Sequence, residues 1–249
     1  MGRLLYLAAV TTALLLSQGT EVITARHRTS AAGVTISNIQ RVSPTSSVCV
    51  LATCTITVAS TTAGNLGVVL ATTGDPTTYI SSVSGGGTWT ANGACAAASI
   101  AQDGMSDIAY NLNLTGGATT ITVTTSSNYP GYVAYAEYHG GTWTLDGACA
   151  SAANVAASLT ASSPPVTTTG AKDLIVTAID IDYQHYSTQT VTGTGWTNPF
   201  DIFLPGPAFS NTNGVGNDAL NVSAGTYQMS VTQNSSMGYS SSALAFQSN

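Results

Sequence analysis

Hydrophobic and polar positions alternate along most of this chain with a period of two residues. Ile56 and Val58 alternate with threonines, and so do Ile121 and Val123. Because successive side chains of a β-strand point to opposite faces of the sheet, this alternation predicts strands with one buried and one polar face. The other runs with strand character cover residues 66–71, 107–114, 132–139, 174–182, 227–232 and 242–247.

Glycine-rich and Ser/Asn-rich clusters separate these runs, and helical periodicity is almost absent. Only residues 148–161 suit a short helix. Many strands without helices for parallel crossovers predict antiparallel sheets that stack face to face. We therefore expect an all-β fold, an antiparallel two-sheet sandwich. A jelly-roll topology is the first choice and an immunoglobulin-like topology is the second.

The N-terminal residues have the pattern of an export signal. Arg3 precedes an apolar stretch at residues 4–16, which is too short to span a bilayer comfortably. A buried N-terminal helix is the alternative. We predict a signal peptide over residues 1–25, a polar segment over 26–47 and a single β-sandwich domain over 48–249. No later stretch is apolar enough for a membrane span, so we expect a secreted protein, extracellular or at the cell surface.

A Ser-Ser-Pro-Pro sequence at residues 162–165 has the composition of a linker. It indicates either a boundary between two domains or a stiff loop within one sandwich. The second interpretation is preferred, because sequence similarity between the two halves is confined to one short segment.

Charged residues are scarce, at 6% of the chain, whereas ordinary globular domains contain roughly a quarter. Threonine and serine together exceed a quarter of all residues, so hydroxyl groups must supply most of the surface polarity. The chain has one lysine, Lys172. Binding to nucleic acid requires clustered Lys and Arg, so nucleic acid is not an expected partner, and neither is anionic lipid.

The segment at residues 86–96 returns at residues 140–150 with nine of eleven positions identical, a tryptophan and a cysteine among them. Four cysteines in an exported chain favour two disulfides, for which three pairings are possible. The repeated context favours Cys95–Cys149, which leaves Cys49–Cys54. The second pair requires a turn or bulge between its members. Metal binding is the rival interpretation, but the spacing of metal-ligand motifs is missing.

Four short sequences carry a resemblance to known proteins. They are Ala-Gly-Asn-Leu-Gly-Val-Val-Leu-Ala at 63–71, Tyr-Ala-Glu-Tyr at 135–138, Lys-Asp-Leu-Ile-Val at 172–176 and Ser-Ala-Leu-Ala-Phe at 242–246. Their succession resembles uncharacterised β-sandwich modules, jelly-roll and concanavalin-like, of bacterial secreted and surface proteins. The resemblance covers most of residues 50–247. It implies a concanavalin-like double sheet and no defined activity or catalytic residues.

Acidic residues supply the candidate chemistry. Asp180 and Asp182 share one face of a strand end, and Glu137 and His139 share one face of another. A glycosidase needs two carboxyl groups beside the scissile bond, so Glu137 is the candidate acid and Asp180 or Asp182 the candidate nucleophile. Aromatic residues nearby would then stack on sugar rings; these are Tyr135, Tyr138, Trp143, Tyr183 and Tyr186.

Two other interpretations of these residues remain open. Asp180 and Asp182, with Asp201 or Asp218, have the hard oxygen ligands that calcium prefers, or all of them are solvated loop carboxylates. Trp89 and Trp143 either stack on a ligand or pack beside the disulfide, and the repeated Gly/Cys context favours packing.

No other enzyme template is present. A Gly-x-Ser-x-Gly elbow is missing, and the histidines His27, His139 and His185 lack metal-ligand spacing. We therefore expect a secreted, non-catalytic β-sandwich that acts through its surface in adhesion, surface coating or glycan binding. Assembly between copies through exposed strand edges is a variant. The alternative is a glycan-active hydrolase. No cofactor is expected other than calcium.

Overall fold

The computed structural model describes residues 34–42, 48–49, 52–99, 104–128, 131–181, 196, 198–200 and 213–249. This part of the chain is all-β and contains no helix. In consequence, no helix that could cross a membrane is found there. The expected signal peptide at residues 1–25 lies outside the described residues.

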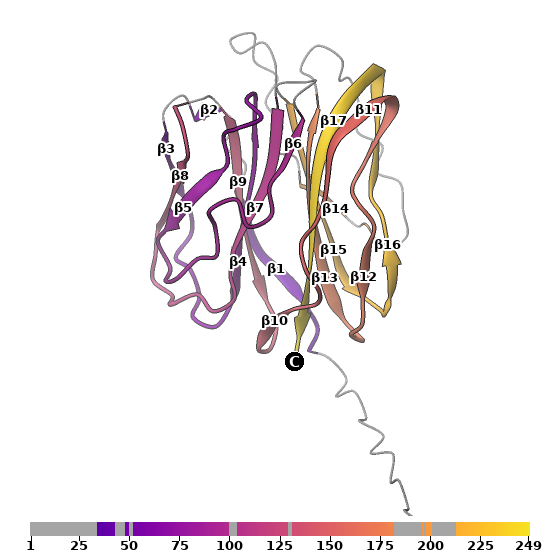
Figure 1. Cartoon of the computed structure of the whole chain (residues 1–249). Coiled ribbons are helices and arrows are strands. Elements are labelled where there is room, and N and C mark those ends of the chain that lie inside the picture. Colours follow the sequence, from indigo (N-terminus) through magenta and orange to yellow (C-terminus); the bar gives the residue numbers. More distant parts are fainter. Residues whose placement is uncertain are drawn as a thin grey trace, which may run out of the picture.

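Two large antiparallel sheets form the centre of the molecule (Figure 1). The first sheet has the order β1-β9-β4-β7-β6, and β2 also pairs with β9. Its strands are β1 (Ser37–Val42), β2 (Val48–Cys49), β4 (Leu66–Thr73), β6 (Ala97–Ser99), β7 (Gly104–Asn111) and β9 (Gly131–His139).

The second sheet has the order β10-β17-β13-β15-β14, and β11 pairs along β17. Its strands are β10 (Trp143–Leu145), β11 (Ala150–Ser162), β13 (Asp173–Ile181), β14 (Asn198–Phe200), β15 (Asn213–Val222) and β17 (Ser230–Ser248). Every pairing in both sheets is antiparallel, which confirms the predicted fold class.

Two smaller sheets lie outside the two large ones, one on each side (Figure 1). On the side of the first sheet are β3 (Thr53–Thr57), β8 (Thr120–Thr125) and β5 (Ile80–Ser84), in the order β3-β8-β5. On the opposite side β12 (Val166–Thr168) pairs with β16 (Gly225–Tyr227). The two-sheet prediction did not include these outer layers.

The layering explains the hydrophobic pattern of β4, whose eight residues are all buried. Leu66, Val68 and Leu70 face the second sheet, whereas Val69 and Ala71 face the three-stranded sheet. A strand covered on both faces needs apolar residues at consecutive positions. Strand β8 has only one covered face, so its hydrophobic residues alternate with threonines. Each fully buried Leu or Ile contributes about 1.5–3 kcal/mol through removal from water.

Two expectations about local structure were wrong. Residues 148–161 do not form a helix, since β11 occupies most of this range and pairs with β17 through several register shifts. Alanine has the highest helix propensity, but propensity is a weak preference that tertiary contacts override, and here pairing with β17 decides the outcome. The polar segment at residues 26–47 contains strand β1, and Ile36 just before it is buried in the central core.

The segment at residues 162–165 joins β11 to β12 within the fold. Ser163 is buried, its backbone N–H donates to Met229 O at 2.8 Å, and the Met229 N–H donates to Ser163 Oγ at 3.0 Å. These contacts hold Ser163 against Met229, the residue just before β17.

The disulfide predicted from the repeated segment is present. Cys95 and Cys149 are bonded, with their Cα atoms 5.5 Å apart. Cys95 lies two residues before β6 in the first large sheet, and Cys149 directly precedes β11 in the second, so the bond ties the two sheets together. Cys54 is also in a disulfide, while the side chain of Cys49 is outside the described residues.

Candidate functional site

Glu137, the expected catalytic acid, is an interior residue of β9 with 0% of its surface exposed. Its Oε1 accepts hydrogen bonds from Thr62 N at 2.9 Å and Asn65 Nδ2 at 2.6 Å. Its Oε2 accepts from Gln40 Nε2 at 2.6 Å and Tyr135 OH at 3.3 Å. A carboxylate has about four lone-pair directions. All of them are used inside the protein, so none is left for a substrate.

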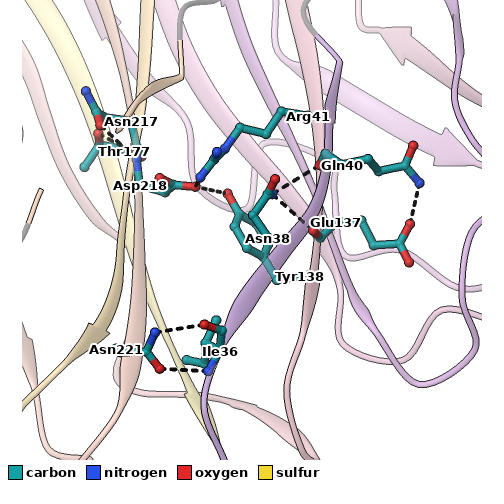
Figure 2. Close-up of polar contacts among 10 residues, drawn as sticks. All are labelled: Ile36, Asn38, Gln40, Arg41, Glu137, Tyr138, Thr177, Asn217, Asp218 and Asn221. Atoms are coloured by element: carbon teal, nitrogen blue, oxygen red, sulfur yellow. Dashed lines mark hydrogen bonds and ion pairs between the residues drawn. The ribbon is translucent and has the colours of Figure 1, made fainter. Parts of the chain in front are cut away.

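A second carboxylate network connects the two large sheets (Figure 2). Arg41 of β1 donates to Asp218 Oδ2 of β15 from Nε at 3.1 Å and from Nη2 at 2.5 Å, and Tyr138 OH of β9 donates to the same oxygen at 2.8 Å. Burial and the neighbouring Asp218 carboxylate raise the pKa of the Tyr138 phenol far above its ordinary value. The phenol therefore stays protonated and remains a donor at any physiological pH.

The chain just before β1 is held by one side chain of the second sheet. Asn221 Oδ1 accepts from Ile36 N at 2.7 Å, and Asn221 Nδ2 donates to Ile36 O at 2.8 Å, so the amide acts as a strand partner (Figure 2). Asn221 has a φ of 58°, a left-handed conformation that asparagine tolerates better than most residues. Together, Gln40, Arg41 and Ile36 fasten the N-terminal strand to both sheets.

The structure does not bring Glu137 and Asp180 together. Glu137 pairs with Gly67 at the start of β4. Asp180 pairs with Gly214, and a Cβ on Gly214 would lie 2.2 Å from the hydroxyl of Thr72, near the end of β4. Five residues of an extended strand separate these positions by about 17 Å. Glycosidase carboxyl groups lie within roughly 10 Å of each other, so this pair cannot act on one bond.

The other residues of the predicted acidic cluster are Asp180, His139 and Asp182. Asp180 is 1% exposed and lies against the backbone of Gly104 in the opposite sheet. His139, at the end of β9, contacts Asn65 Oδ1 through Nδ1 at 3.1 Å. Asp182 lies outside the described residues, so the pairing of Glu137 with Asp182 stays a prediction.

The expected sugar-stacking residues are part of the core. Tyr135, Tyr138 and Trp143 are 0%, 1% and 3% exposed, so none presents a ring face to a ligand, and this part of the prediction is wrong. Tyr183 and Tyr186 lie outside the described residues. Trp89 is half-buried, packs edge-on against Tyr135 with 6.4 Å between ring centroids, and donates its indole N–H to Gly85 O at 2.7 Å.

Within the described ranges, no group of three or more His, Cys, Asp or Glu side chains is placed to hold a metal ion. Asp218 already faces the guanidinium of Arg41, which occupies the position a cation would need. Asp182 and Asp201 lie outside the described residues. A calcium site built on Asp180 and Asp182 therefore stays a prediction. If calcium binds there, a chelator should lower the melting temperature.

Two further carboxyl groups have altered acidity. Burial raises the pKa of Asp107 to about 6, although the backbone N–H groups of Ile80 and Ile108 donate to it at 2.9 and 2.8 Å. Burial, together with the neighbouring carboxylate of Asp146, raises the pKa of Asp173 to about 6. Both groups sit in the interior and fasten loops, so their chemistry bears on stability.

A hollow of about 400 Å³ opens on the surface where two loops meet. The first loop follows β5 and is bridged to β7 by paired hydrogen bonds between Thr90 and Tyr110, at 2.7 and 3.0 Å. The second loop follows β7 and is shaped by Asn111, which donates to Gly86 O and accepts from Asn113 N, both at 2.9 Å. The residues that line the hollow, here called the amide–hydroxyl groove, are Thr88, Thr90, Asn111, Leu112, Asn113 and Thr115.

The amide–hydroxyl groove is neutral and has free polar groups. Thr88, Thr90, Asn113 and Thr115 are exposed, and in the described part of the protein their side chains make no hydrogen bonds. Leu112 adds an apolar contact. The sequence does not reveal this site, because these residue types occur throughout the chain and only the bridge between the two loops places them together.

Comparisons with known proteins add little to this geometry. No protein-family model matches the chain, and no curated protein matches it. Among solved structures, the chain is similar to a beta-porphyranase of glycoside hydrolase family 86 from the human gut bacterium Bacteroides plebeius, at 12% identity and a TM-score of 0.28. The match covers 79% of this chain and 32% of the length of that enzyme. A likeness of this size does not assign an activity.

Proposed function

We propose that this protein is a secreted, non-catalytic β-sandwich that binds neutral carbohydrate through the amide–hydroxyl groove, as an adhesion or surface-coat module. The observation that carries the proposal is a groove where the exposed side chains of Thr88, Thr90, Asn113 and Thr115 have no hydrogen-bond partner within the described chain. Such groups are free to exchange their hydrogen bonds to water for hydrogen bonds to a ligand.

The chemistry of the lining favours a neutral, hydroxyl-rich ligand. A threonine hydroxyl both donates and accepts, and an asparagine amide does the same through two atoms, which suits the hydroxyl groups of a sugar. The lining has no ionisable side chain, so a charged ligand would lose hydration without gaining an opposite charge. A volume of about 400 Å³ falls within the range of small-molecule sites.

The contacts of the acidic residues support a binding function over hydrolysis. Glu137 has its four acceptor positions filled by protein donors, and Asp218 is paired with Arg41. A catalytic acid must reach the leaving-group oxygen, and both of these carboxylates are enclosed. We therefore place the ligand on the surface of the sandwich.

The test is a glycan array probed with protein that lacks residues 1–25. Thr90→Val keeps the shape of the side chain and removes the hydroxyl. Loss of one or two hydrogen bonds should weaken binding by about tenfold. The matched control is Thr167→Val on β12, an exposed threonine on the other side of the sandwich, which should bind as the parent protein does. A silent array, or equal binding by Thr90→Val, would rule out carbohydrate recognition at this groove.

Assembly between copies is a variant of this proposal. Among the described residues, strands β1 and β14 lie at edges of the large sheets, and the low charge of the chain weakens repulsion between molecules. Light scattering of the purified protein at high concentration tests the variant. A strict monomer rules it out without affecting the binding proposal.

A further inference from the structure

The outer face of the three-stranded sheet β3-β8-β5 carries a regular set of hydroxyl groups. Its inner face packs Ile56, Ile121 and Val123 against the first large sheet. The alternate residues point away from the core and are all threonine or serine. They are here called the hydroxyl array: Thr53, Thr55 and Thr57 on β3, Thr120, Thr122 and Thr124 on β8, and Ser82 and Ser84 on β5.

The register of the three strands places these side chains in rows. The first row is Thr53, Thr124 and Ser82, the second is Thr55, Thr122 and Ser84, and the third is Thr57 and Thr120. Neighbours within a row lie about 4.8 Å apart, and successive rows lie about 6.8 Å apart, because alternate residues of antiparallel strands repeat at these distances. The array is therefore a two-dimensional lattice of chemically similar groups.

The hydroxyl groups of the array are free. Some threonine hydroxyls elsewhere in the protein bond to the backbone; Thr73 donates to Thr78 O at 2.9 Å and Thr168 donates to Ser223 O at 2.8 Å. No side chain of the array makes a hydrogen bond in the described part of the chain. The three strands also contain no Asp, Glu, Lys or Arg. The face thus carries no charge and presents hydroxyl donors and acceptors that have no partner within the described chain.

The geometry of the array selects among neutral partners. A single sugar chain binds best in a groove or on an aromatic ring, and strands β3, β8 and β5 contain no aromatic residue. A regular lattice of hydroxyl groups binds most strongly to a partner whose own groups repeat at regular spacings, because many weak hydrogen bonds then form at the same time. The branched Cβ of threonine restricts χ1, so little side-chain entropy is lost when the lattice is engaged.

We propose that the hydroxyl array binds ordered water at the surface of ice. Water molecules in ice are neutral, each donates and accepts hydrogen bonds, and they repeat in two dimensions at spacings similar to those of the array. Threonine offers a hydroxyl that joins this lattice and a methyl group that lies against it. This activity uses the opposite side of β3, β8 and β5 from the core and does not depend on the amide–hydroxyl groove.

The test measures how much protein a slowly growing ice surface takes up, and the gap between freezing and melting temperatures of a single crystal. The parent protein should enter the ice and open a measurable gap, whereas Thr122→Lys, at the centre of the array, should reduce uptake by at least about tenfold. Thr55→Val keeps the branched shape and removes one hydroxyl, so it should give an intermediate loss. Thr167→Lys, outside the array, is the control and should match the parent protein.

Three results would overturn this inference. They are exclusion of the parent protein from ice, uptake of Thr122→Lys equal to that of the parent, and uptake that falls equally in Thr167→Lys. Binding of the array to crystalline polysaccharide, or pairing of two copies through this face, would replace ice as the partner. Circular dichroism of each variant separates loss of binding from loss of folding. Loss of carbohydrate binding in Thr90→Val leaves the ice experiment unchanged, so the two proposals fail separately.

Discussion

Asp173 should make this protein less stable as the pH rises from about 4 to about 6. Its side chain is fully buried at the start of β13, where Oδ2 accepts a hydrogen bond from Gly170 N at 2.8 Å. Asp146 lies beside it and is itself held by Thr169 N at 2.5 Å and Thr169 Oγ1 at 2.7 Å. Ionisation of Asp173 would place a buried negative charge beside the partly exposed carboxylate of Asp146.

The direction follows from proton linkage. Burial, and then Asp146, raise the pKa of Asp173 from 3.8 to about 6 in the folded protein. Between these values the folded state binds a proton that the unfolded state has released, so the free energy of unfolding falls as the pH rises. A shift of this size corresponds to at most about 3 kcal/mol, present below pH 4 and lost above pH 6.

The assay is urea unfolding at several pH values between 4 and 7, followed by the fluorescence of the buried Trp143. Burial raises the pKa of Asp107 to about 6 as well, so the two carboxyl groups should contribute similarly to the pH dependence. The side chain of Asp173→Asn has no proton to lose. The variant should therefore lose about half of the slope of the free energy of unfolding against pH. Asp146→Asn removes the neighbouring charge but leaves Asp173 buried, so it should reduce the slope by a smaller amount.

Two outcomes would refute this reasoning. The first is a parent protein whose stability rises between pH 4 and 6, since that requires carboxyl groups that are more acidic in the folded state. The second is an Asp173→Asn variant with the full slope of the parent, which would show that Asp173 does not bind the proton.

Three other predictions concern the contacts that hold the sheets together. Glu137→Gln should lower the free energy of unfolding by about 2 kcal/mol, because the NH2 group of glutamine would face hydrogen-bond donors where the carboxylate oxygen accepted from them. Hydrogen exchange should then show that the amides of β1 are less protected than those of β4. Arg41→Met should cost about 3–5 kcal/mol by leaving Asp218 as a buried charge, and adding Asp218→Asn should restore part of it, measured by urea unfolding. Cys95→Ser with Cys149→Ser should cost about 4 kcal/mol, seen as a lower melting temperature, because the bond closes a loop across 54 positions.

The strands were well predicted where hydrophobic residues alternate or run continuously. The runs expected at 66–71 and 132–139 lie within β4 and β9, and the alternation of Ile121 and Val123 with threonines lies within β8. Strand β1 was not found, because its polar side chains bond to Glu137 and Asp218, which lie about 100 and 180 positions later in the chain. The amide–hydroxyl groove was not found either, since no short pattern of Thr and Asn distinguishes it from other loops.

The sequence by itself determined the fold class, the scarcity of charge and the disulfide of the repeated segment. Each is a local property: the period of two comes from strand geometry, and the repeated Trp-Cys context identifies equivalent turns. Only the tertiary structure decided which polar groups are available to a ligand. Glu137, Tyr135 and Trp143 are enclosed by neighbours from distant strands, while threonines that look ordinary in the sequence keep their hydroxyl groups free at the surface. Burial and bonding depend on what packs against a residue, and the sequence around that residue does not contain this information.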